Sequence, residues 1–318
     1  MKSDNNPPRL AIVVPCYNEE AVLTETNTRL TALLRELSDK SKITSDSFIV
    51  YVNDGSKDQT WSLICQLQQQ SLQVRGVKLA HNAGHQNALM AGLESFKADA
   101  DAIVTIDADL QDDVNAISAM VDAYLEGSDI VYGVRKERTT DTVFKRTTAL
   151  AFYKLMAVMG TDTVYNHADY RLMSRRAVEA LCEYPERNLF LRGLVPLLGF
   201  TTKNVFYDRA ERFAGESKYP FSKMLAFAID GITSFSIKPI TIIFITGILC
   251  FFIGVIMLAW GLYSYFKGSV VPGWTSLIVS LWLIGGVVIT SLGVIGQYIG
   301  KIYIEVKHRP RYHIEKIV

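Results

Sequence analysis

The sequence lacks the cysteine and histidine patterns that build metal sites or disulfide frameworks. Its 318 residues contain four cysteines, far apart and without a C-x-x-C pair. We expect reduced thiols, with neither a disulfide nor a cysteine-bound metal. His85 and His167 have no third ligand at metal-binding spacing, so we expect them to make local hydrogen bonds.

An excess of charge of either sign is also missing. The formal net charge is +1 and the sequence pI is about 7.6, so the composition does not favour a nucleic-acid partner. Residues 1–9 are polar, and no apolar core follows a basic start, so a cleaved secretory peptide is not expected. Hydrophobic residues make up 49%, which is high for a soluble protein and prompts a search for membrane spans.

Short apolar runs alternate with helical patterns in the first part of the chain. Strands are expected at 10–15, 48–52, 74–80, from Ala102 onward, and at 130–133, with helices between them. This order implies right-handed βαβ crossovers and an α/β fold with a mostly parallel sheet.

Acidic and amide side chains follow the strand that starts at Ala102. Asp107, Asp109 and Gln111 are spaced i, i+2, i+4, so an extended chain would project them to one side at the strand's carboxyl end. That edge of a parallel sheet binds ligands, and oxygen donors suit Mg²⁺ or Mn²⁺ with phosphate oxygens completing the shell. An acidic turn that caps the next helix is the alternative interpretation.

Polar clusters also follow the three preceding strands, which places them on the same rim of the predicted sheet. Taken alone, Asp54 could equally contact a ligand or form an Asx-turn before Gly55. Gly84 could allow the backbone to lie close to a ligand, or it could serve only a backbone conformation that favours glycine. The clusters are Tyr17-Asn18-Glu19, Asp54 and Asn82-Ala83-Gly84.

Four motifs in order resemble the nucleotide-sugar-binding half of glycosyltransferase family 2, whose fold is called GT-A. They are V-V-P-C-Y-N-E-E, V-N-D-G-S-K-D, H-N-A-G-H-Q-N-A-L-M-A-G and D-A-D-L-Q-D. H-A-D-Y-R-L-M at 167–173 and R-F-A-G-E-S-K-Y at 212–219 narrow the resemblance to the polyprenyl-phosphate glycosyltransferases. That group includes dolichyl-phosphate mannose synthase and the bactoprenol glucosyltransferases. The resemblance covers roughly residues 10–312 and implies a Rossmann-like GT-A catalytic domain at 1–219.

The resemblance assigns the rim residues to a sugar nucleotide and a divalent ion, Mg²⁺ or Mn²⁺. Asp109 would act in catalysis through the ion, which neutralises charge on the leaving diphosphate. The nucleotide-sugar-binding residues would be Pro15, Tyr17, Glu19, Asp54, Gly84 and Asp107, and the metal ligands Asp107, Asp109 and Gln111.

Asp169 and Arg171 would be catalytic residues near the acceptor, with Asp169 as the candidate base. A phosphate monoester is already largely dianionic at neutral pH, so little proton abstraction is required. Asp169 would then orient an arginine or the acceptor, and a plain Asp169–Arg171 ion pair is the structural alternative. Family members usually have Gly-Asp where this chain has Ala168-Asp169, which weakens a sugar assignment from this loop.

Basic residues are the candidates for gripping an anionic phosphate. The segment 135–160 has the pattern of a basic amphipathic helix at a membrane surface, or of a solvated helix with one core face. The loop 205–219 would close over the site, and a flexible linker is its alternative. The candidate acceptor-binding and phosphate-binding residues are Arg135, Arg138, Arg209, Arg212, Ser217 and Lys218.

Two long stretches without a charged side chain, 239–266 and 268–300, each exceed the length that crosses a bilayer. We expect an interfacial helix at 220–238, a transmembrane hairpin at 239–300 with spans of about 240–266 and 274–299, and a cytoplasmic tail at 301–318. Flanking basic residues predict an inner-membrane, multi-pass protein with the catalytic domain and both termini in the cytoplasm. Glycines of the second stretch suggest helix packing in a homo-oligomer, for which a tetramer is one candidate.

The predicted function is inverting transfer of one sugar, glucose or N-acetylglucosamine, from a UDP-sugar to polyprenyl (undecaprenyl) phosphate at the lipid bilayer. A processive polysaccharide synthase is disfavoured because no Arg-Trp pair occurs. A catalytically silent sugar-nucleotide-binding scaffold is disfavoured because every expected acidic position is filled.

Overall fold

The computed structural model describes residues 6–136, 167–187, 189–208, 238–267 and 273–318. The chain divides into two units. The first contains a sheet with its helices and takes in the C-terminal residues Arg309–Val318. The second contains two long helices and ends at His308.

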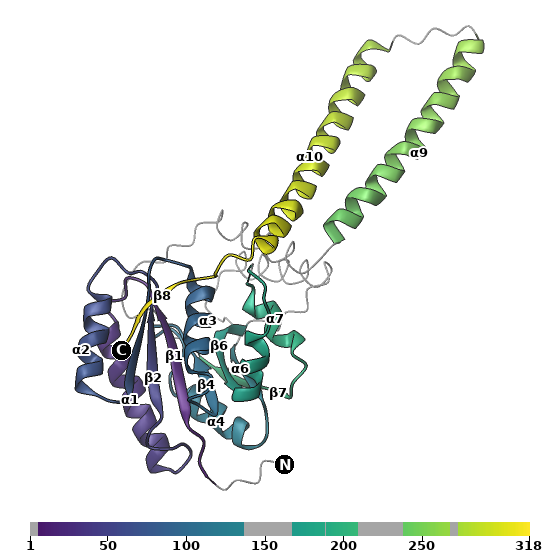
Figure 1. The fold of residues 1–318 in the computed structure, drawn as a ribbon. Helices are drawn as coiled ribbons and strands as arrows, with labels where there is room; N and C mark the ends of the chain where they lie inside the picture. Colours follow the sequence, from purple (N-terminus) through teal and green to yellow (C-terminus); the bar gives the residue numbers. More distant parts are fainter. Residues whose placement is uncertain (1–5, 137–166, 188, 209–237, 268–272) are drawn as a thin grey trace. The chain divides into compact units, whose positions relative to one another are not determined.

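Within the described residues, one mixed sheet of eight strands organises the first unit (Figure 1). The order is β7-β5-β6-β4-β1-β2-β3-β8. The strands β1 to β4 are parallel, β6 runs antiparallel between β4 and β5, and β8 runs antiparallel beside β3. The bounds are β1 (Leu10–Cys16), β2 (Phe48–Asn53), β3 (Val74–Leu79), β4 (Ala102–Thr105), β5 (Ile130–Arg135), β6 (His167–Ser174), β7 (Thr202–Tyr207) and β8 (Ile314–Ile317).

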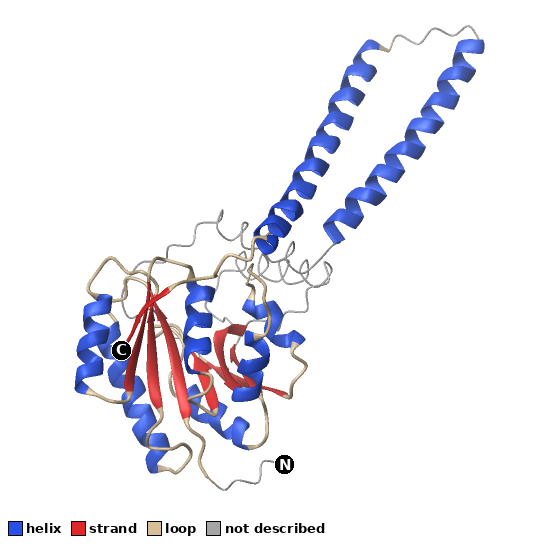
Figure 2. Ribbon diagram, viewed as in Figure 1, coloured by secondary structure: helices blue, strands red, loops and turns tan. Residues whose placement is uncertain are grey.

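Helices cover the sheet, as Figure 2 shows, and the predicted α/β class is confirmed. The expected strands correspond to β1 to β5, and each of the first three is followed by a helix as predicted. The helices of this unit are α1 (Leu23–Asp39), α2 (Thr60–Gln70), α3 (His85–Phe96), α4 (Ala116–Leu125), α6 (Arg175–Cys182) and α7 (Leu191–Leu197).

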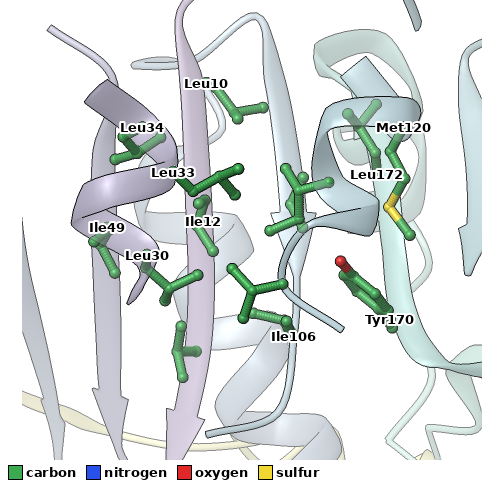
Figure 3. Close-up of a cluster of buried hydrophobic side chains, with 14 of the residues drawn as sticks. Leu10, Ile12, Leu30, Leu33, Leu34, Ile49, Ile106, Met120, Tyr170 and Leu172 are labelled. Atoms are coloured by element: carbon green, nitrogen blue, oxygen red, sulfur yellow. The ribbon is translucent and has the colours of Figure 1, made fainter. Parts of the chain in front are cut away.

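The core of the first unit follows from the two periodicities of strand and helix. Alternate residues of β1, such as Leu10 and Ile12, belong to one buried cluster with leucines of α1 and with Met120 of α4 (Figure 3). On the opposite face, α3 lies close to β1: a Cβ at Gly92 would lie 2.5 Å from Cγ1 of Val13. Burial of each leucine side chain contributes roughly 1.5–3 kcal/mol to the free energy of unfolding. The core therefore holds in place the strand ends that carry the polar residues of the rim.

The second unit contains the helices α9 (Lys238–Phe266) and α10 (Trp274–Val306). Among the residues whose side chains are described, Ile284–Val306 is long and apolar enough to cross a membrane, with a mean hydropathy of 1.5 and no part of it buried. The described apolar part of α9, Lys238–Leu249, is shorter than a span. The predicted two-helix transmembrane hairpin and the interfacial helix at 220–238 therefore stay predictions. All of the interfacial segment except Lys238, where α9 begins, lies outside the described residues.

The C-terminal segment 301–318, for which the sequence predicted a cytoplasmic tail, contains the end of a helix and a strand. Helix α10 continues to Val306, and residues 314–317 return to the first unit as β8 at the edge of the sheet. Gly76 and Val318 exchange backbone hydrogen bonds of 2.8 and 2.9 Å, and Lys78 Nζ lies 2.7 Å from Oε1 of Glu315. A strand of four residues with every side chain exposed gives little sequence signal, which explains why this pairing was missed.

Candidate active site

The loops after β1 and β2 are joined by hydrogen bonds at the carboxyl edge of the sheet. The N–H of Asn18 donates to Oγ of Ser56 (3.0 Å), and Oδ1 of Asn18 accepts from the N–H of Lys57 (2.9 Å). The N–H of Glu19 donates to Oγ1 of Thr60 (2.9 Å). Asn18 has a φ of 55°, a conformation that asparagine tolerates better than most residues. Two separate loops therefore form one connected rim.

The predicted nucleotide-binding residues of the first loop lie at different depths in this rim. Pro15 is buried within β1, opposite Val52 of β2. Tyr17 is 43% exposed, and Glu19 is half-buried. Tyr17 is thus the aromatic side chain of this loop that is accessible to a ligand, whereas Pro15 supports the strand end.

Asp54 anchors the loop after β3 to the end of β2. The carboxylate is 3% exposed, and its oxygens accept from the backbone N–H groups of Ala83 (2.6 Å) and Gly84 (3.0 Å). Burial raises the pKa of Asp54, and these two hydrogen bonds oppose the rise. The contacts seen are those of a loop anchor, so the predicted contact between Asp54 and the nucleoside stays a prediction.

Glycines on both sides of this anchor have left-handed backbone conformations. Gly55 has a φ of 66°, and a Cβ there would lie 2.5 Å from the backbone nitrogen of Asn82, which only glycine avoids. Gly84 has a φ of 93° and directly precedes α3, with open space where a Cβ would lie. The backbone of the loop after β3 thus lies close to Gly55, whereas Gly84 has a turn conformation at the start of α3.

The segment after β4 does not continue as an extended strand. The chain turns at Ala108 and Asp109, and Leu110 has a φ of 57°. The N–H of Gln111 donates to Oδ1 of Asp109 (3.2 Å), and the carbonyl of Ala108 accepts from Oγ1 of Thr26 (2.9 Å). Strand alternation therefore does not place Asp109 and Gln111 relative to Asp107 as predicted, because a turn sets their positions.

Asp107 lies among groups of both charges. Burial raises its pKa, and the carboxylates of Asp112, Asp169 and Asp109 raise it further, while His85 lowers it. Oδ1 of Asp107 is 3.5 Å from Nε2 of His85 at the start of α3. A cation bound here would relieve the repulsion between these carboxylates, so the donor chemistry fits a divalent ion.

Protein side chains alone do not complete a metal shell in the described part of the chain. No group of three His, Cys, Asp or Glu residues there has the geometry to hold an ion. Carboxylates and amides such as Asp107, Asp109 and Gln111 are the donors that Mg²⁺ and Mn²⁺ accept, and Mg²⁺ commonly uses one or two carboxylates together with substrate phosphates. The residues present therefore fit an ion whose remaining ligands come from a bound diphosphate.

Asp169 is held between two arginines. Arg171 Nη2 lies 2.5 Å from Oδ1 of Asp169, and Arg192 Nη2 lies 3.3 Å from Oδ2. Burial alone would raise the pKa of Asp169, but Arg192, Arg171 and His85 outweigh it and hold that pKa well below its usual range. Nε2 of His85 is 3.7 Å from Oδ2. Asp169 is thus ionised and strongly paired, which makes it a weak proton acceptor.

Arg171 is part of the protein interior. Arg171 is 1% exposed. In addition to its ion pair with Asp169, it donates a hydrogen bond from Nη1 to the carbonyl of Leu191 (3.3 Å). The carbonyl of Asp169 accepts from Oγ1 of Thr105 (2.6 Å), which ties β6 to β4. The ion-pair alternative from the sequence is the arrangement seen, and Arg171 positions Asp169 and the start of α7.

Arg135, one of the predicted phosphate-binding residues, is paired with a carboxylate and a tyrosine hydroxyl of the protein. Its Nη2 donates to Oδ1 of Asp112 (3.0 Å) and its Nε to the hydroxyl of Tyr207 (3.2 Å). Tyr207 itself donates to Oδ1 of Asp112 (2.6 Å), and the carboxylate and hydroxyl hold the pKa of Arg135 above its usual range although burial opposes this. The other predicted phosphate-binding residues, Arg138, Arg209, Arg212, Ser217 and Lys218, lie outside the described residues.

A cavity of about 490 Å³ lies between α1 and the segment that follows Asp109. Its lining includes Arg29, Leu33, Asp112 and Asp208, and none of the predicted nucleotide-binding residues. We therefore place the site by the side-chain chemistry around Asp107 and Asp169 rather than by this cavity.

Three site residues have contacts that their place in the sequence did not predict. Asp112 follows the acidic motif closely but is 2% exposed, and its partners Arg135 and Tyr207 are distant in the sequence. His85 was expected only to make local hydrogen bonds, although it lies in one of the family motifs. Arg192 did give a signal, because it is the only charged residue in the apolar run 189–198.

A glycosyl transferase family 2 model matches residues 11–182, more than half of the chain. The chain belongs to this family. The match covers β1 to β6 and therefore every rim segment described above, so the chain is a glycosyltransferase with the family's mostly parallel sheet.

Relatives match over nearly the full length. The uncharacterized glycosyltransferase YkoT of Bacillus subtilis (strain 168) is 51% identical, over 97% of this chain and 91% of that protein. The SfII prophage-derived bactoprenol glucosyl transferase of Shigella flexneri is 39% identical, over 97% of this chain and 98% of that protein. Among solved structures, mannosyl-3-phosphoglycerate synthase from Rubrobacter xylanophilus matches with a TM-score of 0.49 and 15% identity, over 70% of this chain and 71% of that chain.

Proposed function

We propose that this enzyme transfers one glucosyl group from UDP-glucose to a polyprenyl phosphate. The observation that carries the proposal is the 39% identity to a bactoprenol glucosyl transferase over 97% of this chain and 98% of that protein. A match of that extent includes the C-terminal helices as well as the sheet. Glucose is therefore favoured over N-acetylglucosamine, which the sequence alone left open.

The sugar nucleotide would bind along the rim formed by β1 to β4. Tyr17 is the accessible aromatic side chain, and the loop held by Asp54 leads into α3. Asp107, Asp109 and Gln111 would hold Mg²⁺ or Mn²⁺ together with the diphosphate. When bound, the ion supplies charge neutralisation for the leaving UDP. The crowding of carboxylates around Asp107 supports this placement.

The transfer would be a single inverting displacement. An oxygen of the lipid phosphate forms the new bond to C1 of glucose as the bond from C1 to the diphosphate oxygen breaks, and UDP leaves. The lipid phosphate is largely dianionic at neutral pH, so the step needs no strong base. The depressed pKa of Asp169 agrees with this, and we assign Asp169 to positioning its arginines rather than to proton transfer.

The acceptor is a membrane lipid, so the enzyme would work at a bilayer surface. The apolar segment Ile284–Val306 supports membrane attachment. We further propose that α9 and α10 form the predicted hairpin in the inner membrane, with the catalytic domain and both termini in the cytoplasm. Assembly as a homo-oligomer remains part of this proposal.

The test is a donor panel. Membranes that contain the overproduced full chain are incubated with undecaprenyl phosphate, Mg²⁺ or Mn²⁺, and radiolabelled UDP-glucose, UDP-N-acetylglucosamine or GDP-mannose, and the lipid is extracted. We expect label in the lipid fraction from UDP-glucose and at least about 10-fold less from the other donors. Preferred transfer from another nucleotide sugar would refute the donor assignment, and no lipid product with any donor would refute the function.

A further inference from the structure

Arg192 lies at the start of α7, in a position that the surrounding contacts fix. The preceding residue, Leu191, is 2% exposed, and its N–H donates to Oε1 of Gln86 on α3 (2.9 Å). The carbonyl of Leu191 accepts from Nη1 of Arg171 (3.3 Å). Leu194 is also buried, so the helix presents Arg192 from a rigid support.

The two arginines that contact Asp169 differ in depth and in the closeness of their contacts. The Arg171 side chain is 2% exposed and its Nη2 lies 2.5 Å from the carboxylate. The Arg192 side chain is 33% exposed, and its Nη2 and Nε lie 3.3 and 3.4 Å from the two oxygens. Charge-assisted hydrogen bonds are usually about 2.7–2.9 Å long, and the contacts of Arg192 are longer than this. Asp169 therefore binds Arg171 more strongly than it binds Arg192.

Exposure makes Arg192 the outward-facing cation of this group, since its side chain is 33% exposed and that of Arg171 is 2% exposed. One carboxylate faces two guanidinium groups, and the buried Arg171 requires that carboxylate as its counter-ion. Asp169 is therefore shared between the buried Arg171 and the more exposed Arg192. Arginine also presents a planar fork of N–H donors, which matches two oxygens of a phosphate.

We propose that Arg192 is a phosphate-binding residue of the active site. This inference rests on the proposed function and deepens it, because both substrates of that reaction carry phosphate. Asp169 and Arg171 then act as positioning residues that hold the Arg192 fork. The ligand chemistry is a phosphate group, supplied either by the diphosphate of the donor or by the phosphate of the lipid acceptor.

The test compares Arg192→Gln and Arg192→Lys with the control Arg75→Gln in the full chain, purified in nanodiscs. Arg75 is a matched control because it is 27% exposed and its Nη1 lies 3.0 Å from Asp99, near the amino end of β3 and away from the rim. Titration calorimetry with Mn²⁺ measures the Kd for UDP and for uridine. Initial rates measure KM for undecaprenyl phosphate.

Phosphate binding predicts a selective effect of Arg192→Gln. If the group belongs to the donor, the Kd for UDP rises about 10- to 100-fold while that for uridine changes less than about 2-fold. If it belongs to the acceptor, the Kd for UDP is unchanged and KM for the lipid rises by a similar factor. Arg192→Lys should lose less in either case, because a point charge remains without the fork. Arg75→Gln should leave all three constants within about 2-fold of wild type.

Three results would overturn the assignment. The first is Arg192→Gln with all three constants within about 2-fold of wild type. The second is an equal loss of uridine and UDP affinity, which indicates a structural role. The third, decisive if Arg192→Gln does not fold, is Arg192→Lys with constants equal to those of the control. Wild-type protein that forms no lipid product would instead refute the proposed function itself.

Discussion

Replacing Asp54 by asparagine tests whether this residue organises the rim or only contacts the nucleoside. The amide keeps one acceptor oxygen, so one of the N–H groups of Ala83 and Gly84 loses its partner and faces an NH₂ group. An unsatisfied buried donor costs about 1–3 kcal/mol. The amide is uncharged, so it avoids the free-energy cost of burying a carboxylate charge, the effect that raises the pKa of Asp54. This saving offsets part of the loss. We expect a net destabilisation of about 1–2 kcal/mol.

Thermal unfolding of the purified full chain should show this as a decrease in Tm of about 3–6 °C. Hydrogen exchange adds a local measurement, because the amides of Ala83 and Gly84 should exchange about 10-fold faster in Asp54→Asn. The control is Asp99→Asn, which removes a surface partner of Arg75 and should cost less than about 1 kcal/mol. An unchanged Tm with unchanged exchange at residues 80–87, combined with weaker UDP binding, would show that Asp54 is a ligand contact and not an anchor.

The remaining predictions concern stability and are read from denaturant or thermal unfolding. Gly55→Ala should be at least about 2 kcal/mol more destabilising than Gly84→Ala, because both have a positive φ but only Gly55 has backbone atoms where the Cβ would lie; equal effects would contradict this. For Asp129, burial would raise the pKa, but hydrogen bonds from Arg176, Thr201 and Ser174 outweigh it and lower the pKa to about 2. Ionised Asp129 therefore stabilises the fold above its usual pKa of 3.8, and this contribution is lost as the pH falls toward 2. Asp129→Asn should cost about 2 kcal/mol at pH 7 and progressively less below pH 4, whereas a cost independent of pH would rule this out. Glu94→Ala leaves the guanidinium of Arg311, 8% exposed, without its carboxylate and should cost about 2 kcal/mol; no loss would mean that the C-terminal segment is not held by α3.

Much of the fold could be predicted because local pattern and tertiary structure agree in the first part of the chain. The apolar runs that became β1 to β5 are short, rich in branched residues and separated by helical patterns. Of the later strands, β6 and β8 were not predicted, for two different reasons. The segment that forms β6, His167–Ser174, was interpreted as a functional motif and not as a strand. The strand β8 pairs with β3, which is more than 200 residues away in the sequence, so local pattern does not predict it.

The candidate site could be located from the sequence but not built from it. The rim follows from parallel strands that end in polar residues, and the structure brings those loops together. What the sequence could not show is how each charge is used. Arg135 was predicted to bind phosphate, yet the fold pairs it with Asp112. Arg171 was predicted to be catalytic, and it forms the ion pair with Asp169 that was the alternative interpretation. Exposure then singles out Arg192, which no motif contains.

The most direct test of the account is transfer of radiolabelled glucose by purified protein and by Asp109→Ala. Full-length enzyme in nanodiscs is given UDP-glucose, undecaprenyl phosphate and Mn²⁺, and both lipid-linked label and released UDP are measured. The account predicts equal amounts of the two products from wild type and a rate lower by about 10²–10³-fold for Asp109→Ala, the scale for loss of one preorganised electrostatic group. Near-normal transfer by Asp109→Ala would contradict the assignment of the rim as the catalytic centre.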